Sequence, residues 1–482
     1  MKSKICFVRV KGVYLSLEGV GLLAAMLIVS SQLAVYIAHS LLLSGCRKKH
    51  VEPIGRAGES RNVSFIVPVR KEPLEYVENA VRYVGSLGIP GYEVVIVSDD
   101  DVDVRDELFE LVKRLREEGL NVWIMWRSVP RGFRTGALND GLYLSTGDYV
   151  YVLDVDTRPE RCFFDYAISV LKSNPDCVAV TGRWEPLNAD TRVSEALALG
   201  LRFLTRVLYR ARSCVGLFPY PLGTGTLYNA RLLKELLGGW DENRIQDDME
   251  LGARIMYSGL KIKYLDECAI RVENPGTYRG FRIQQSRWAY GALDAAIARF
   301  KYIFKSKYPL HVKIEALLYL LQYIPQFLVF GGTLILSLVL LVAPRDYMAM
   351  IVPLLAVWIA SLPVYIYFMF KEGFWERSLW KFAVLSGRLS AISTAVSPYV
   401  TVSSLKAVFR VREVYKRTPK GVYQKTFTSL RIPWELLLGL LYCGIGLYAL
   451  IEGLVISAAW LIISSAGYLY VVYRFSRDVF YK

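Results

Sequence analysis

Hydrophobic residues follow three different patterns along the 482-residue chain. An uncharged apolar block from Val20 to Leu43 is long enough to cross about 30 Å of hydrocarbon as a helix. From about Ser60 to Asp190, short β-branched runs alternate with amphipathic stretches, and after about Tyr308 the chain is apolar again. The pattern predicts a globular domain between an N-terminal spanning helix and a group of C-terminal membrane helices.

The N-terminal apolar block is predicted to be retained as a spanning helix. Arg47, Lys48 and Lys49 follow it, which is the pattern of a stop-transfer sequence. A cleaved signal peptide would be shorter and would end at a small-residue cleavage site.

The central region predicts a mostly parallel, doubly wound α/β sheet, because apolar strands alternate with helical patterns. The predicted strands are Ser64–Val69, Glu93–Val97, Val122–Trp126, Tyr149–Leu153 and Val178–Thr181, and the helical candidates include Leu74–Val84 and Asp106–Glu118. Ligands of such sheets bind outside the carboxyl ends of the strands. Acidic residues at those ends are therefore the first candidates for a site.

The C-terminal region contains four predicted spans and one weaker apolar stretch, Leu379 to Ala407. The spans are Ile314–Val342, Tyr347–Phe370, Trp434–Ile451 and Leu454–Tyr473. The connection over 406–431 is rich in Lys and Arg and contains one acid, Glu413, so the positive-inside rule puts it in the cytoplasm. Two hairpins satisfy this rule if the weaker stretch lies along the interface or re-enters. The basic residues before the first span leave its orientation weakly determined, and the larger C-terminal excess puts the globular region in the cytoplasm.

Composition excludes several classes of protein. The chain is 53% hydrophobic with a net charge of +15, which is too apolar for a purely soluble protein and favours anionic lipid or phosphate as a partner. Its three histidines lie far apart, so zinc or Ser-His chemistry is not expected. Seven cysteines without a CxxC pair predict no disulfide scaffold and a reducing compartment for the globular region.

Two strand ends carry acidic clusters. Asp99, Asp100 and Asp101 follow the strand VVIV, and Asp154 and Asp156 follow YVYVL. Residues two apart in an extended chain face the same side, so the second pair suits one hard divalent cation. The alternative for the first cluster is a turn that caps the next helix.

Two polar segments are candidates for phosphate binding and for a catalytic base. The loop over 131–139 contains glycines and Arg134 before a helix, and could bind phosphate or simply be solvated. Asp247 and Asp248 begin a predicted helix, Asp248–Tyr257, either as capping residues or as a base for a sugar hydroxyl.

A third segment, Gln284-Gln-Ser-Arg287-Trp288, lies in a stretch with apolar residues at near-helical spacing. A membrane-surface helix would explain this spacing but not the clustering of Gln, Arg and Trp.

The order of these motifs, followed by membrane spans, resembles the membrane-integrated synthases of glycosyltransferase family 2, which include cellulose, chitin and hyaluronan synthases and glucosylceramide synthase. The resemblance covers about Ser64 to Trp288 and extends loosely through the C-terminal spans. It implies a GT-A type nucleotide-diphospho-sugar transferase domain. Gln246-Asp247-Asp248 replaces the family's Thr-Glu-Asp, and Arg134 stands where many members have Lys.

The resemblance implies a role for each motif. It implies Asp248 as general base, Asp154 and Asp156 as diphosphate and metal ligands, and either Mg²⁺ or Mn²⁺ as the metal. The other implied donor contacts are Asp99, Asp100, Arg134 and Arg287, and the implied acceptor contacts are Asp247, Gln284 and Trp288. A basic segment with Tyr415, Thr418 and Lys420 is similar to the gating loop of cellulose synthases, with Tyr415 for Phe and Arg417 for Val.

The sequence therefore predicts a membrane-bound inverting glycosyltransferase with an α/β doubly wound catalytic domain and an α-helical transmembrane region. The predicted divisions are an N-terminal tail and helix over 1–50, a cytoplasmic catalytic domain over 51–300, and C-terminal transmembrane and interfacial helices over 301–482.

A nucleotide sugar, with a UDP-sugar favoured, would supply a growing polysaccharide, with export as a possible coupled step, in the plasma membrane. Transfer of one sugar to a membrane lipid is the alternative enzyme, and a nucleotide-sugar-binding transporter or channel is the alternative of another class. The bilayer is the expected partner, and nucleic acid is not.

Overall fold

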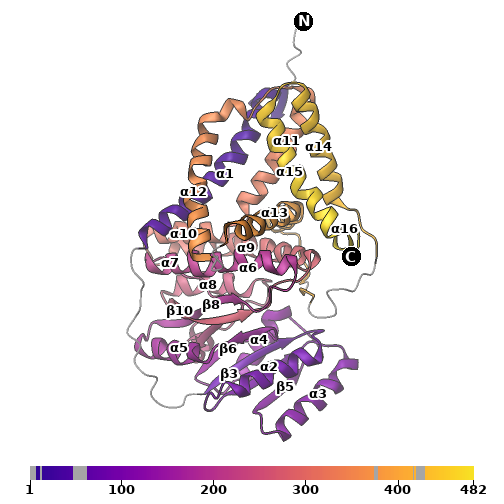
Figure 1. The fold of residues 1–482 in the computed structure, drawn as a ribbon. Helices are drawn as coiled ribbons and strands as arrows, with labels where there is room; N and C mark the ends of the chain where they lie inside the picture. The colour runs from indigo at the N-terminus through magenta and orange to yellow at the C-terminus, as the bar shows by residue number, and fades with distance from the viewer. Residues whose placement is uncertain are drawn as a thin grey trace.

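The computed structural model describes residues 7–10, 13–46, 62–373, 378–415, 417–419 and 429–481. An α/β domain lies below a bundle of long apolar helices, and further helices lie between the two (Figure 1). A two-stranded hairpin, β1 (Phe7–Val10) and β2 (Val13–Ser16), precedes the first long helix.

The first half of the α/β domain is a parallel sheet with helical crossovers. Its strands, in spatial order, are β5 (Val122–Trp126), β4 (Glu93–Ser98), β3 (Val63–Val69) and β6 (Tyr149–Val152). Its helices are α2 (Leu74–Ser86), α3 (Val102–Glu117) and α4 (Phe133–Leu144). The strands are continuously apolar because helices cover both faces of the sheet. All four strands form where the sequence predicts them.

The second half of the sheet is mixed. Its strands, outward from β6, are β9 (Thr226–Asn229), β8 (Cys177–Pro186), β10 (Lys261–Val272) and β7 (Thr157–Pro159). β9 is antiparallel to β6 and β8, and β7 is antiparallel to β10. The sequence predicted β8 but not the other three, because β7 and β9 are short and β10 carries charged residues.

Several helices pack on this second half. They are α5 (Arg161–Ser173), α6 (Arg192–Arg202), η1 (Phe203–Tyr209), α7 (Arg210–Cys214), η2 (Leu232–Leu236), α8 (Asp247–Ser258) and α9 (Tyr278–Lys305). α8 begins one residue before the predicted helix. α9 carries the Gln-Arg-Trp motif and packs against α8.

Five helices among the described residues are long and apolar enough to cross a membrane. They are α1 (Leu17–Gly45), α11 (Ile324–Val342), α12 (Val352–Gly373) together with the short η3 (Ala349–Ile351), α14 (Trp434–Ile451) and α15 (Val455–Arg474). α13 (Leu379–Val408) lies across the lower end of this bundle, where it packs on α9 and α6 (Figure 1). The other short helices are α10 (Leu310–Leu320) and α16 (Ser476–Phe480).

The structure corrects the prediction that the cysteines form no disulfide scaffold. Cys46 at the end of α1 is bonded to Cys214 in α7, and Cys162 in α5 is bonded to Cys268 in β10. The partners are 168 and 106 residues apart, so only the tertiary fold brings them together. The cysteines consequently no longer support a reducing compartment.

Candidate active site

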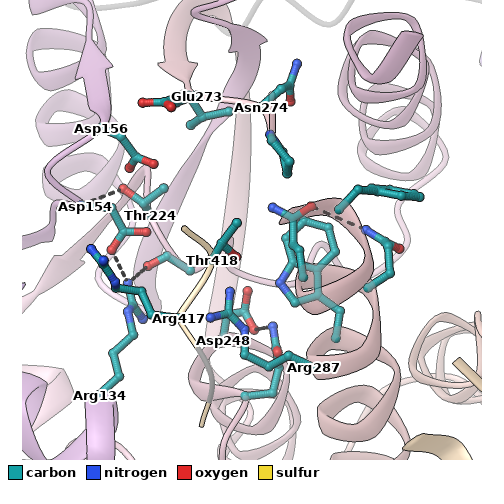
Figure 2. A pocket seen from close by; sticks show the side chains of 18 of the residues that line it. Arg134, Asp154, Asp156, Thr224, Asp248, Glu273, Asn274, Arg287, Arg417 and Thr418 are labelled. Carbon is teal, nitrogen blue, oxygen red and sulfur yellow. Dashed lines mark hydrogen bonds and ion pairs between the residues drawn. The ribbon is translucent and has the colours of Figure 1, made fainter. Parts of the chain in front are cut away.

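A cavity of about 690 Å³ is lined by residues that follow the carboxyl ends of the strands and by residues of α6, α9 and α13. It brings together most of the residues that the sequence singled out (Figure 2). Those in its lining are Asp99, Arg134, Asp154, Asp156, Asp247, Asp248, Gln284, Arg287, Trp288, Tyr415 and Thr418. Asp100 is not in the lining, and Lys420 lies outside the described residues.

The Asp-Val-Asp segment directly follows β6, and neighbouring loops hold it in place. The backbone N–H of Asp154 donates to the Thr224 hydroxyl at 3.2 Å, and that hydroxyl donates to the Val152 carbonyl at 3.2 Å. Arg134 donates to the Asp154 carboxylate at 2.8 Å. Figure 2 shows Asp154, Asp156 and Thr224 along one side of the cavity, with Arg134 below them.

Arg134 links the Asp-Val-Asp segment to α8. Besides Asp154, its guanidinium donates to the Asp247 carboxylate and, at 2.9 Å, to the Gly223 carbonyl. Arg134 is in the first turn of α4, which begins after Gly132 with φ 64°. A Cβ at Gly132 would lie 2.6 Å from the Cβ of Glu242, so the close approach of these two loops requires glycine.

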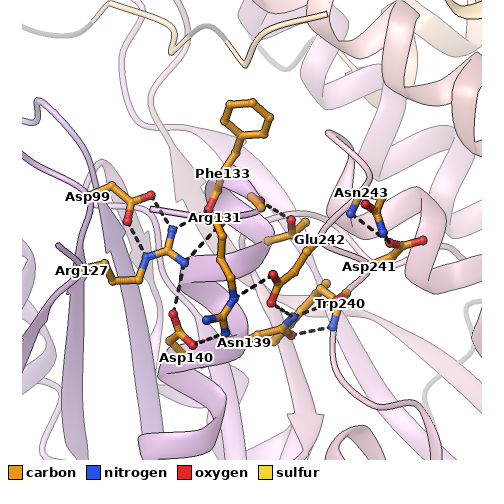
Figure 3. Close-up of polar contacts among 12 residues, drawn as sticks. Asp99, Arg127, Arg131, Phe133, Asn139, Asp140, Trp240, Asp241, Glu242 and Asn243 are labelled. Atoms are coloured by element: carbon orange, nitrogen blue, oxygen red, sulfur yellow. Dashed lines mark hydrogen bonds and ion pairs between the residues drawn. The ribbon is translucent and has the colours of Figure 1, made fainter. Parts of the chain in front are cut away.

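A buried arginine holds the first acidic cluster. Arg127 binds both oxygens of Asp99, at 2.5 and 2.7 Å, and donates to Asp140 and to the Arg131 carbonyl, each at 3.1 Å. Figure 3 shows this network continuing through Arg131 to Glu242. Asp99 therefore reaches the cavity as part of an internal ion pair.

The Asp100 carboxylate is used in hydrogen bonds within the protein. Its carboxylate accepts from the backbone N–H of Lys71 and from the Ser98 hydroxyl at 2.9 Å. These bonds hold the turns that follow β3 and β4. The structure thus separates two neighbouring aspartates that the resemblance had grouped together.

Asp248 is a strongly perturbed carboxyl group of the cavity. Burial and the neighbouring Asp247 carboxylate raise the pKa of Asp248 to about 7. Gln246 Nε2 donates to its Oδ1 at 2.8 Å, and the Met249 backbone N–H donates to the same oxygen at 2.7 Å. Burial also raises the pKa of Asp247, although Arg134 opposes this. Asp248 is thus a buried, oriented carboxyl group poised near neutral pH.

The α9 motif forms the side of the cavity opposite the strand ends. The Arg287 guanidinium lies 4.7 Å from the centre of the Tyr415 ring, a cation–π contact. The Tyr323 hydroxyl donates to Gln285 Oε1 at 3.0 Å and so ties this helix to the start of α11. Gln284 and Trp288 line the same side.

The segment similar to a gating loop crosses the cavity. Arg417 donates to Glu72 at 2.6 Å, and Tyr415 packs on Phe133 with ring centres 6.5 Å apart. The Thr418 hydroxyl is buried and has no hydrogen-bond partner among the described residues. Figure 2 shows Arg417 and Thr418 between the Asp154 side and the Arg287 side.

Sequence reasoning missed several residues that build the site. Thr224 lies in a Gly-Thr-Gly-Thr segment that carries no charge, and Gln246 directly precedes the two aspartates. Arg127 and Glu72 stand apart from any motif, and only the fold brings Glu72 into the cavity lining and Arg127 against Asp99. Glycine at 291 was also unremarked, although a Cβ there would lie 2.5 Å from the Cβ of Gln246.

The membrane-facing part of the cavity is apolar. It is formed by side chains of α6, η1 and α13, namely Leu197, Leu201, Leu204 and Leu389. The polar side chains of Tyr323 and Gln326 in the α11 region and of Ser393 in α13 lie beside this apolar part. The cavity therefore has one charged side and one side that belongs to interfacial helices.

A mixed sheet whose strand ends carry this carboxylate set, joined to apolar helices, defines a GT-A-like nucleotide-sugar transferase. A family model for glycosyl transferase family group 2 matches residues 149–370. The family 2 match covers these residues, and the protein is a glycosyltransferase. The protein is thus an enzyme, which was the first of the two classes that the sequence left open beside a transporter or channel.

Relatives agree with this assignment. The chain is 28% identical over 458 residues to a probable glycosyltransferase of Sulfolobus acidocaldarius, covering 92% of this chain and 97% of that protein. It is 30% identical over 237 residues to glucomannan 4-beta-mannosyltransferase 7 of Arabidopsis thaliana. That match covers 47% of this chain and 41% of the plant protein, so the chain spans less than half of the plant relative's length.

A solved structure shares the fold. It is a mannosyltransferase of Pyrobaculum calidifontis in complex with GDP-Man and Mn²⁺, with a TM-score of 0.54 and 19% identity. The match covers 82% of this chain and 100% of that chain. The five apolar helices indicate that the enzyme is associated with a membrane.

Proposed function

We propose that this enzyme transfers a mannosyl residue from a nucleotide-diphosphate donor, with inversion, to a hydroxyl group of an acceptor held at the membrane surface. The observation that carries the proposal is the meeting of buried Asp248, the Asp154–Asp156 pair and the Arg287–Trp288 motif in one cavity below interfacial helices. Plant relatives named glucomannan mannosyltransferases support the mannosyl group. We therefore favour a nucleotide-diphospho-mannose as the donor over the UDP-sugar that the sequence favoured.

Asp248 is the proposed general base. It takes the proton of the acceptor hydroxyl as that oxygen attacks the anomeric carbon from the face opposite the diphosphate. The bond from the anomeric carbon to the phosphate oxygen breaks, and the nucleoside diphosphate leaves with the electron pair. Arg134 and Arg287 supply positive charge on the two sides of the cavity for this leaving group.

Asp154 and Asp156 are the proposed ligands of a divalent cation. Their carboxylate oxygens are the donor type that Mg²⁺ and Mn²⁺ prefer, and both residues line the cavity after β6. The bound cation would neutralise charge on the departing diphosphate. The Thr418 hydroxyl, buried without a partner among the described residues, offers a further donor to that group.

The acceptor has two candidates. The names of the plant relatives support a growing polysaccharide, with export as a coupled step. The apolar side of the cavity, formed by Leu197, Leu201 and Leu389, supports a lipid-anchored acceptor instead. We give the lipid-anchored acceptor precedence, because a polysaccharide would leave this apolar surface uncovered.

We propose the plasma membrane as the location, with the catalytic domain in the cytoplasm. The support is the basic connection over 406–431, which has a single acid, Glu413. α13 directly precedes that connection and lies across the lower end of the bundle on the side of the catalytic domain (Figure 1).

The test uses the full-length protein in nanodiscs. GDP-mannose, UDP-glucose and UDP-N-acetylglucosamine are screened with Mn²⁺ or Mg²⁺ in extracted membrane lipids, followed by analysis of product length. In Asp248→Asn we expect transfer to fall about 10²- to 10⁴-fold while donor binding persists. Asp103→Asn, on the exposed side of α3, is the matched control and should transfer normally. Unchanged transfer by Asp248→Asn would overturn the proposal.

A further inference from the structure

A second cavity, of about 910 Å³, adjoins the catalytic cavity. Phe133 and Ile245 line both cavities and so form the boundary between them. The second cavity lies between α9, the end of α10, the end of α13 and the loop that precedes α8.

Two elements continue from the catalytic cavity into the second one. On α9, Arg287 lines the first cavity, and Tyr290, Asp294, Ile297 and Lys301 line the second at helical spacing. After α13, Arg410, Arg412 and Glu413 line the second cavity, and Tyr415 lines the first. A ligand in the second cavity would therefore lie along surfaces that lead to Asp248.

The second cavity has an excess of positive charge. Each acidic side chain in its lining already has a cation: Glu242 pairs with Arg131 at 3.1 Å, Asp294 with Arg244 at 2.7 Å and Glu413 with Lys406 at 2.5 Å. Lys301, Arg410 and Arg412 have no ion-pair or hydrogen-bond partner for their side chains within the part of the chain that the structure describes. Three uncompensated cations at one cavity favour an anion with more than one charge.

The surroundings of the second cavity are apolar. Phe300 and Ile297, both in its lining, are 48% and 41% exposed. On α10, Leu310, Ile314 and Leu318 form an exposed stripe at four-residue spacing, as in a helix that lies on a membrane. A soluble anion would leave these side chains uncovered, whereas a lipid with a charged head group would cover them.

The end of α13 brings the cations to this position. The Val411 backbone N–H donates to the Lys406 carbonyl at 2.8 Å, which closes the last turn of the helix. Arg410 takes the left-handed conformation there, with φ 56°, at a position where glycine is common. The chain then turns towards the catalytic cavity with Arg410 and Arg412 in the cavity lining.

We propose that the second cavity binds the phosphate or diphosphate group of a lipid-anchored acceptor, whose sugar reaches Asp248 past Phe133 and Ile245. Lys301, Arg410 and Arg412 bind the phosphate, and Phe300 and the α10 stripe contact the hydrocarbon chain. This inference rests on the proposed function and specifies its acceptor as a lipid phosphate ester.

Binding of defined probes tests the inference. The full-length protein is held in phosphatidylcholine nanodiscs, with Mn²⁺ and the nucleoside diphosphate identified by the donor screen saturating the catalytic cavity. The dissociation constants of farnesyl diphosphate, farnesol and inorganic diphosphate are then measured. Farnesyl diphosphate should bind most tightly, because it alone has both the charge and the hydrocarbon chain.

Variants test whether the probe binds in the second cavity. Arg410→Gln/Arg412→Gln should weaken farnesyl diphosphate binding at least about tenfold, and Lys301→Gln, on a different helix, should weaken it severalfold. Lys113→Gln/Arg231→Gln removes two exposed cations from distant surfaces and should bind like the unaltered protein. Equal binding by Arg410→Gln/Arg412→Gln and the unaltered protein would overturn the inference.

Competing ligands give further outcomes. Inorganic diphosphate that binds as tightly as farnesyl diphosphate would assign the cavity to a free anion and overturn the lipid assignment. Loss of farnesyl diphosphate binding in phosphatidylglycerol nanodiscs would assign the cavity to bulk anionic lipid, again against the inference. Slow release of sugar from the donor to water by the unaltered protein tests the proposed function separately, since it needs no acceptor lipid.

Discussion

The two sides of the catalytic cavity are built from different kinds of element. On the donor side, strand ends and tight loops hold charged groups through internal pairs, such as Arg134 with Asp154. On the membrane side, the helices α6, α9 and α13 supply apolar and aromatic groups, such as Leu389 and Trp288. Under the proposed function, the difference means that charge in a fixed frame selects the donor, whereas shape and the nearby membrane select the acceptor. The two sides should therefore respond differently to substitution.

The largest effect is expected from Asp156→Asn on the donor side. Replacing one of the two proposed carboxylate ligands should weaken the divalent site, so transfer should fall at least about 100-fold. Mn²⁺ affinity, measured by electron paramagnetic resonance without substrate, should fall as well. The exposed Asp103→Asn variant is the control. Normal Mn²⁺ affinity in Asp156→Asn would show that Asp156 does not bind the metal.

The second effect concerns pH. The proposed base, Asp248, must be deprotonated to act, and burial and Asp247 raise its pKa to about 7. The logarithm of kcat/KM should rise with unit slope up to about pH 7 and level off above it. Donor binding should stay nearly constant over pH 5.5 to 8, because the sugar diphosphate keeps its charge there. A transfer rate that stays level down to pH 5 would contradict the role of Asp248.

A smaller effect is expected on the membrane side. Leu389→Asn places an amide in the apolar surface and should raise the KM for a lipid acceptor roughly three- to tenfold. The donor KM should not change, because Leu389 lies away from the strand ends. Leu389→Met keeps the surface apolar and should behave like the parent enzyme. An equal rise in both KM values would mean that the two sides are not separate in function.

The smallest effect on catalysis is expected from the loss of a disulfide. Cys162→Ser removes the link between α5 and β10, so the free energy of unfolding should fall by roughly 2–4 kcal/mol while transfer at low temperature stays near normal. Cys443→Ser, at a free cysteine, is the control for thermal unfolding. Equal unfolding temperatures in the two variants would show that the bond does not stabilise the domain.

The donor half of the fold was largely predictable. Buried parallel strands such as β4 and β6 are continuous apolar runs, and their position fixes where Asp99 and Asp154 emerge. The order of motifs then indicated the enzyme class. The second half of the sheet was harder to predict, because β9 and β10 combine short or charged sequences with pairing between distant segments.

Contacts between distant residues could not be predicted. Nothing in the local sequence joins Arg417 to Glu72, Thr224 to Asp154 or Cys46 to Cys214. Asp99 and Asp100 are adjacent and chemically alike, yet one pairs with Arg127 and the other with backbone. Such roles depend on which element packs beside each carboxylate, and periodicity does not contain that information.

The position of Arg134 has a kinetic consequence. One guanidinium holds both Asp154 and Asp247, so a donor diphosphate that takes up its hydrogen bonds also releases Asp247 on the side where the acceptor arrives. Substrate binding should then follow a compulsory order, with the nucleotide sugar first and the acceptor second. The nucleoside diphosphate, as the last product to leave, should inhibit competitively against the donor and non-competitively against the acceptor.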